Sequence, residues 1–144
     1  MMYATPTLDQ HDQRRLTSSL VVLLPRVSAI TAEFCTLLEI ADPGLRLRFP
    51  SDERHIEPVV EHLLGSVADM DVAQEIAGEF AKQGMAYGVQ ETDLPTLLAA
   101  IQTAIAETAG YTWTNQLEQT WTRWFDGFSY AMLSHAHGKD QLAA

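Results

Sequence analysis

Residues 113–132, WTNQLEQTWTRWFDGFSYAM, decide the fold class of this protein. Large apolar side chains recur there every three or four residues, at Trp113, Leu117, Trp121, Trp124, Phe125, Phe128 and Met132. This spacing is typical of one face of an α-helix. Because a face so rich in aromatic side chains has to be covered by other elements, we expect this segment to be the central helix of an all-α protein.

The same spacing predicts a series of helices upstream. They cover residues 10–24, 25–41, 51–67, 72–87 and 93–109, with a short turn through residues 45–50. Pro25 suits the opening turn of its helix. Pro58 belongs either in a first turn or at a kink, because proline costs about 3 kcal/mol in a helix interior. Gly88 and Gly110 are expected to end helices, and Asp93 to cap the start of one. The pattern therefore predicts six or seven helices.

The length of 144 residues suits one domain with a sizeable core. The helical domain is expected to span residues 10–135, between a short flexible N-terminus at residues 1–9 and a disordered C-terminal tail at residues 136–144. Apolar residues make up 47% of the chain, which is too many for a disordered protein. We therefore expect the domain to fold by itself.

The charge of the chain argues against two classes of partner. Its formal net charge is −10 and no long Lys/Arg cluster offsets it, so nucleic acid and anionic membrane surfaces should be repelled. No leader-like order of residues and no stretch of roughly 18 apolar residues is present, so neither export nor membrane insertion is expected. The one cysteine, Cys35, allows no intrachain disulfide. These features predict a cytoplasmic protein.

Several short strings of residues indicate the fold more specifically than the helical spacing of apolar residues does. They are LPR at residues 24–26, ITAEF at 30–34, DPGLR at 42–46, FP at 49–50 and YGV at 87–89, followed by Trp121, Phe125 and Met132. In this order the chain resembles the single-domain bacterial globins related to the flavohaemoglobins, over roughly residues 14–133. The resemblance implies the globin fold, with Phe49 in the place of the family's invariant phenylalanine.

Three positions depart from that family where its function resides. The histidine that binds haem iron lies three residues before the tyrosine of the YGV string, which here is Gly84. The tyrosine that stabilises bound dioxygen corresponds to Cys35, and a second tyrosine, which orients the histidine, corresponds to Leu94. Because glycine cannot bind iron, haem held in the conventional way is not expected.

The resemblance still marks a set of haem-pocket positions, which bind a cofactor only if haem is present. They are Cys35, Phe49, His55, Val59, Gly84, Met85 and Tyr87. His55 is the first candidate for an unusual iron or metal ligand, since its imidazole, if it faces the pocket, could bind iron or a ligand. The alternative is a solvated histidine at a helix start. Met85 and Cys35 are weaker candidates for the same role and are expected to be core residues.

Other residues carry weaker signals for function. His62 lies seven residues after His55, too far for both to hold one small ion, and the string at 135–137, HAH, is expected to be a solvated helix end. The aromatic run of residues 113–128 is interpreted as core. No phosphate-binding loop or nucleophile elbow occurs, and the chain has no room for a reductase domain. An enzyme is therefore not expected.

Two interpretations of function remain open at this stage. In the first, the chain is a binding or sensor protein without conventional haem, whose vacated pocket admits a small apolar ligand such as a fatty acid or is closed by neighbours such as Met85. A protein partner, including a second copy of the chain, belongs to the same interpretation. In the second, haem b is held through His55, and the protein binds or senses dioxygen, nitric oxide or another diatomic gas.

Overall fold

The computed structural model describes residues 8–143, with the side chains of Ala68, Met70, Met85 and residues 136–143 left out, and the described part is helical with no strand. The α-helices are α1 Gln10–Leu23, α2 Val27–Ala41, α3 Pro43–Leu47, α4 Glu57–Gly65, α5 Met70–Ala86, α6 Leu94–Ala109 and α7 Asn115–Ala143. Short 3₁₀ turns join most of them. The all-α, single-domain class predicted from the sequence is confirmed, and the arrangement agrees with a globin-like fold.

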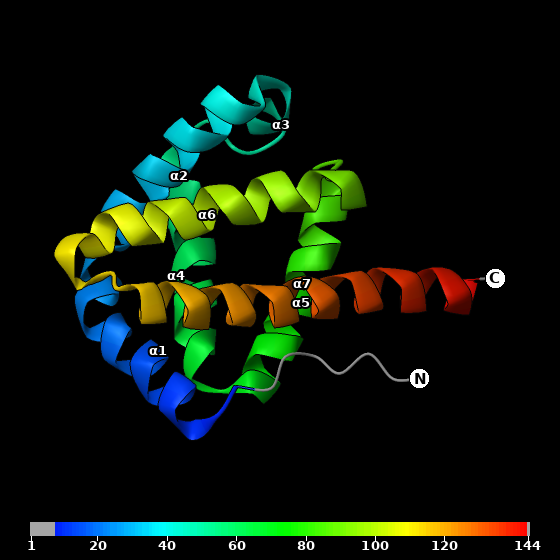
Figure 1. The fold of residues 1–144 in the computed structure, drawn as a ribbon. Coiled ribbons are helices and arrows are strands. Elements are labelled where there is room, and N and C mark those ends of the chain that lie inside the picture. The colour runs from blue at the N-terminus through cyan, green and yellow to red at the C-terminus, as the bar shows by residue number, and fades with distance from the viewer. Residues whose placement is uncertain (1–7, 144) are drawn as a thin grey trace.

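The helices pack in two crossing layers. α6 and α7 run across the front of the molecule in Figure 1, and α4 and α5 cross behind them at a steep angle. The most extensive contacts join α5 to α7 and α2 to α6. The long helix predicted from its aromatic spacing therefore packs against helices from both halves of the chain.

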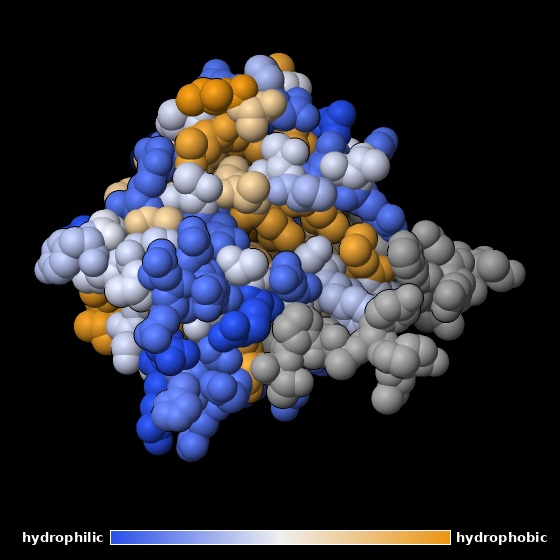
Figure 2. All heavy atoms as spheres, in the orientation of Figure 1, coloured by the Kyte–Doolittle hydropathy of each residue, from blue (hydrophilic) through white to orange (hydrophobic). Residues whose placement is uncertain are grey.

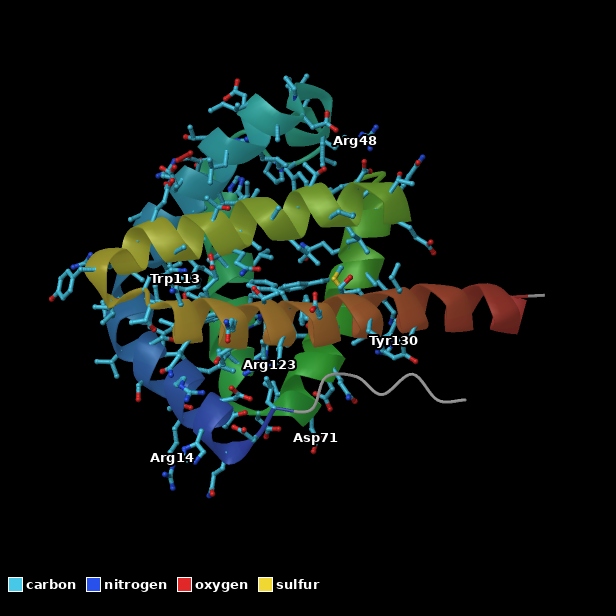
Figure 3. The ribbon with its side chains drawn as sticks, viewed as in Figure 1. Arg14, Arg48, Asp71, Trp113, Arg123 and Tyr130 are labelled. Carbon is cyan, nitrogen blue, oxygen red and sulfur yellow. The ribbon has the colours of Figure 1, made fainter. Side chains whose placement is uncertain are left out.

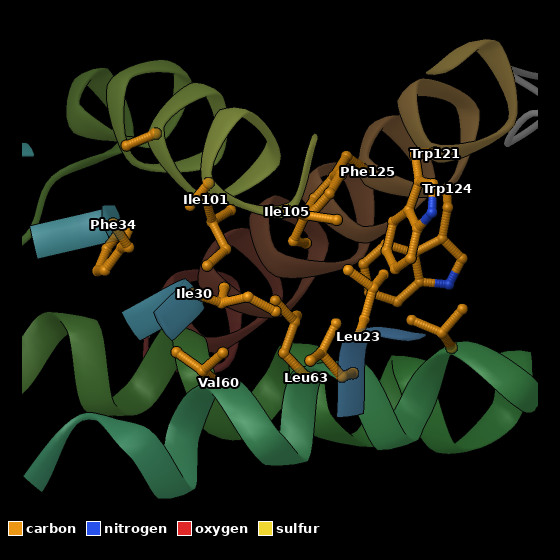
Figure 4. Close-up of a cluster of buried hydrophobic side chains, with 14 of the residues drawn as sticks. Leu23, Ile30, Phe34, Val60, Leu63, Ile101, Ile105, Trp121, Trp124 and Phe125 are labelled. Carbon is orange, nitrogen blue, oxygen red and sulfur yellow. The ribbon is translucent and has the colours of Figure 1, made fainter. Parts of the chain in front are cut away.

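Figure 4 shows how the core is filled between these layers. Leu23, Ile30 and Leu63 point inward from three different helices. Trp121 and Trp124 of α7 are fully buried, and the ring of Trp124 lies stacked on Phe128 with centroids 5.0 Å apart. Close packing of this kind makes the aromatic face of α7 the centre of the core.

Some local structure differs from the pattern of the sequence. Residues 43–47 form a short helix where a turn is predicted, because the Asp42 carboxylate accepts the N–H of Leu45 and Pro43 occupies the first turn. Pro58 lies in the first turn of α4, one of its two predicted places. Asp93 does not cap α6 with its side chain. Its carboxylate accepts the N–H of Gln90 instead, at 2.8 Å.

The two ends of the chain bear on the predicted domain limits. α1 starts at Gln10 with Asp9 as its N-cap, next to the predicted start of the domain. Residues 1–7, most of the predicted flexible N-terminus, lie outside the described residues. α7 continues to Ala143, so the structure has helix where a disordered tail is predicted from residue 136.

A run of residues near the N-terminus is apolar enough to be compared with a membrane span. By length and composition alone, Gln10–Ala41 meets the requirement, as core helices of soluble proteins also do. The run changes to a 3₁₀ turn at Leu24–Arg26, and Leu16, Leu23 and Ile30 within it are fully buried against the rest of the protein. This finding is weak evidence for a membrane location.

A buried carboxylate ties the first helix to the last. Asp12 of α1 is 3% exposed and accepts hydrogen bonds from Thr120 and Arg123 of α7. Figure 3 shows Arg123 on the side of α7 that faces α1. Burial by itself would raise the pKa of Asp12, but the N–H of Asp9 and the side chains of Arg123 and Thr120 outweigh it and lower that pKa.

We expect Asp12→Asn to lower the free energy of unfolding by about 1.5–3 kcal/mol at neutral pH, the range for hydrogen bonds to a charged group. Because the pKa of Asp12 is lowered in the folded protein, its contribution is complete above about pH 4, the value for an unfolded aspartate, and is lost as the pH falls through the folded value. Urea denaturation from pH 2.5 to 7 measures this. The exposed Asp126→Asn serves as the control, and a gap between wild type and Asp12→Asn that stays constant with pH would contradict the assignment.

Candidate functional site

The best-formed cavity in the described part of the chain has a volume of about 130 Å³ and lies between α2, α4, α5, α6 and α7. Most of its lining side chains are apolar. They are Phe34, Phe49, Pro50, His55, Ile56, Val59, Val60, Leu63, Phe80, Gln83, Gly84, Tyr87, Val89, Leu94, Leu97, Leu98, Ile101, Phe128 and Met132. We call this space the apolar pocket.

The inner wall of the apolar pocket is built from helix faces that the periodicity of the sequence turns inward. Phe34 of α2, Val60 of α4 and Ile101 of α6 point toward the same space in Figure 4. Phe80 of α5 and Phe128 of α7 meet edge to face with ring centroids 5.8 Å apart. These contacts make this part of the pocket wall an apolar surface of aromatic and branched side chains.

The rim of the pocket is held by contacts between the segment after α3 and the turn after α5. The rings of Phe49 and Tyr87 lie 5.4 Å apart. Next to them, Arg48 donates to the carbonyl oxygen of Gly88 at 3.0 Å and to the carboxylate of Asp93 at 3.1 Å. Figure 3 places Arg48 near α3, at the end of the molecule where α6 begins. Two segments far apart in the sequence therefore close one side of the pocket.

Gly84 forms part of the wall. A β-carbon built on it would stand 3.5 Å from the β-carbon of Val89, an ordinary van der Waals contact. The position therefore has room for a side chain, and the backbone does not require glycine there. Leu94, in the place of the family's second tyrosine, lines the same pocket.

The structure brings together most of the residues that the resemblance marks. Phe49, His55, Val59, Gly84 and Tyr87 all line the apolar pocket. Cys35 is buried but is not among the lining residues, and its neighbour Phe34 occupies the wall instead. Burial raises the pKa of the Cys35 thiol, which favours its protonated form.

The remaining candidates lie elsewhere or outside the description. The side chain of Met85 is not among the described ones. His62 is exposed and does not line the pocket. His135 packs its imidazole close to Gly78 of α5, while the side chains that follow it are outside the described part. Within the described residues no three His, Cys, Asp or Glu side chains gather in a metal-binding group.

His55 is the lining residue with the most distinctive chemistry. It ends the 3₁₀ turn Glu53–His55, whose start is capped by Asp52. His55 lines the pocket but remains exposed to solvent. The other polar lining residues are Gln83 and Tyr87. Polar chemistry is therefore confined to a few groups in an otherwise apolar wall, as is usual for small-molecule sites.

Several lining residues were not singled out for the pocket by their sequence. Phe80, Gln83 and Val89 belong to it, as do Leu97, Leu98 and Met132. Helical spacing identifies Leu97, Leu98 and Met132 as inward-facing, but it does not say which inward-facing residues leave a space between them. Met132 adds a thioether sulfur to the set of groups that could bind a metal.

The lining does not fit a conventionally held haem. Gly84 offers no donor atom at the position where the globin family binds iron, and about 130 Å³ is below the roughly 300–1,000 Å³ of sites for drug-sized ligands. His55, Tyr87 and Met132 are the lining side chains with nitrogen, phenol or thioether donors. A porphyrin would need the surrounding helices to move apart.

Comparison of the sequence with protein families and with curated proteins found no match. Membership of the globin family therefore stays a prediction.

Proposed function

We propose that this protein is a non-catalytic binding or sensor protein, a divergent relative of the bacterial globins that holds a small apolar ligand in the apolar pocket. The observation that carries the proposal is the cavity of about 130 Å³ whose wall includes Gly84 in place of an iron ligand. A dry cavity of about 150 Å³ lined by leucine, isoleucine and phenylalanine binds benzene or xenon. A ligand of that size suits this space, whereas a whole fatty acid exceeds it.

Titration with benzene tests the proposal directly. Backbone amide shifts in ¹⁵N-labelled protein should change in a saturable way, and the largest changes should fall on the lining residues of α4, α5 and α6. The absorption spectrum of the protein expressed with haem supplied provides the second measurement. A stoichiometric Soret band, or benzene shifts scattered away from the pocket, would overturn this function.

A second candidate function is supported by the place of His55 on the pocket wall. In this alternative the protein takes up haem through His55 and binds a diatomic gas, after the pocket has widened. His55→Ala should then abolish haem uptake or change the absorption spectrum. An unchanged spectrum would remove His55 from the role, with His62→Ala as the matched control on the exposed surface of the same region.

A further inference from the structure

A second hollow lies between α2 and α6, on the side of α6 that faces away from the apolar pocket. It has a volume of about 500 Å³, and its lining contains no charged side chain. We call it the α2–α6 groove. Its residues are Leu37, Ile40, Ala41, Pro95, Thr96, Ala99, Ala100 and Thr103. None of them lines the apolar pocket, so the two features are separate.

The groove exposes apolar surface that the fold itself does not use. Ile40 is 76% exposed, although isoleucine is among the residue types most often buried. Figure 2 shows apolar side chains gathered on the visible face near the end of α2. The floor is made of small residues, Ala99 and Ala100, with Thr96 and Thr103 on either side. Small side chains let another backbone approach closely, and contiguous apolar patches mark interaction sites.

Two like charges meet at one end of this groove. Glu33 lies one turn before Leu37 on α2, and Glu107 lies one turn after Thr103 on α6, so both continue the faces that form the groove. The pKa of Glu33 is raised, mainly by the interaction of its carboxyl group with that of Glu107 and further by loss of hydration. Of the described cationic side chains, none forms an ion pair with either of them. Arg26 donates nearby, to the carbonyl oxygen of Thr108.

We propose that the α2–α6 groove docks an amphipathic helix of another protein, with apolar side chains on Ile40 and the alanine floor and a lysine or arginine between Glu33 and Glu107. A guanidinium or ammonium group supplies donors to both carboxylates and removes their mutual repulsion. Two antiparallel helices with a small-residue floor form the kind of groove that receives a helix through anchors at positions i, i+3 or i+4, and i+7. The contact between the cation and the two carboxylates then gives the pairing its specificity, and the apolar side chains of the bound helix supply the affinity.

Charge also decides between this occupant and a second copy of the chain. In a two-fold symmetric dimer the groove of one copy would face the same groove of the other, which would place Glu33, Glu39 and Glu107 of both copies in one interface. The net charge of −10 adds to that repulsion. A cationic partner is attracted by the same groups. This inference does not depend on the ligand of the apolar pocket.

Selection from a display library of random helical peptides tests the proposal with the intact protein. Enriched peptides should share an apolar stripe at helical spacing and a lysine or arginine at one fixed position. Ile40→Asp should weaken their binding at least tenfold, whereas Val21→Asp, at a site that is 77% exposed against 76% for Ile40, should change it less than twofold. Glu107→Gln should weaken the binding of a peptide several-fold when the peptide carries the lysine or arginine. It should not weaken the binding of the same peptide when that cationic residue has been replaced.

Three results would overturn the proposal. The first is enrichment of no peptide, or of peptides without the cation. The second is binding that survives Ile40→Asp. The third is concentration-dependent dimerisation in sedimentation that Ile40→Asp abolishes, since this would assign the groove to a second copy. Loss of benzene binding in the same variants is not expected, so failure here is distinguishable from failure of the pocket function.

Discussion

Gly84→Leu should weaken benzene binding at least tenfold and leave the protein folded. Gly84 lines the apolar pocket, and a β-carbon there has only an ordinary contact with Val89. The four carbon groups of leucine, each taking roughly the 30 Å³ of a water molecule, would occupy most of a cavity of about 130 Å³. Leucine also favours a helix over glycine by about 0.8 kcal/mol, so the free energy of unfolding should hold or rise.

Gly65→Leu is the matched control for this variant. Gly65 ends α4, and no heavy atom lies within 4 Å of a β-carbon built on it. The same substitution therefore adds the same side chain to a helix without entering the pocket, and benzene affinity should stay within twofold of wild type. Affinity is measured by the amide-shift titration and stability by urea denaturation. Benzene binding that is unaffected by Gly84→Leu would place the ligand elsewhere.

Trp124→Ala should lower the free energy of unfolding by about 3–5 kcal/mol, the range for removing a large buried aromatic side chain. Trp124 is fully buried, stacks on Phe128 at 5.0 Å and meets Phe125 edge to face at 5.1 Å. Alanine would leave a cavity among side chains that belong to several helices. Because a loss of this size can unfold a domain of ordinary stability, circular dichroism at 222 nm against urea is the measurement.

Trp124→Phe keeps this prediction testable if the alanine variant does not fold. The indole N–H of Trp124 is buried and has no hydrogen-bond partner among the described residues, and the same holds for Trp113 and Trp121. Phenylalanine has no N–H donor to bury, and this offsets part of the contact area that is lost. We therefore expect Trp124→Phe to lower the free energy of unfolding by less than about 2 kcal/mol. Tyr130→Ala on the same helix, at a site 48% exposed, should change stability by less than about 0.5 kcal/mol. A loss below 1 kcal/mol for Trp124→Ala would contradict the packing described.

Helix positions are largely a matter of local sequence in this protein. The spacing of Trp121, Phe125 and Phe128 is read along one helix, and the ends of α5 and α6 follow from Gly88 and Gly110, whose φ angles of 79° and 59° suit glycine. The short helix α3 was missed because one turn is too brief to display a period. The residues that indicate this helix in the sequence are its N-cap, Asp42, and the proline of its first turn, Pro43.

The local pattern of residues is enough to predict an all-α protein, most of the side chains that face inward, and a Gly84 that can offer no ligand to iron. The packing of the helices was needed to find that Phe34 and not Cys35 lines the pocket, that Phe80 and Met132 join its wall, and that Asp12 meets Arg123 from 111 residues away. The spacing of apolar residues depends on the geometry of a single helix, so it can be recognised in a short stretch of sequence. Cavities and distant pairs depend on the angles and distances at which helices cross, which many side chains set together.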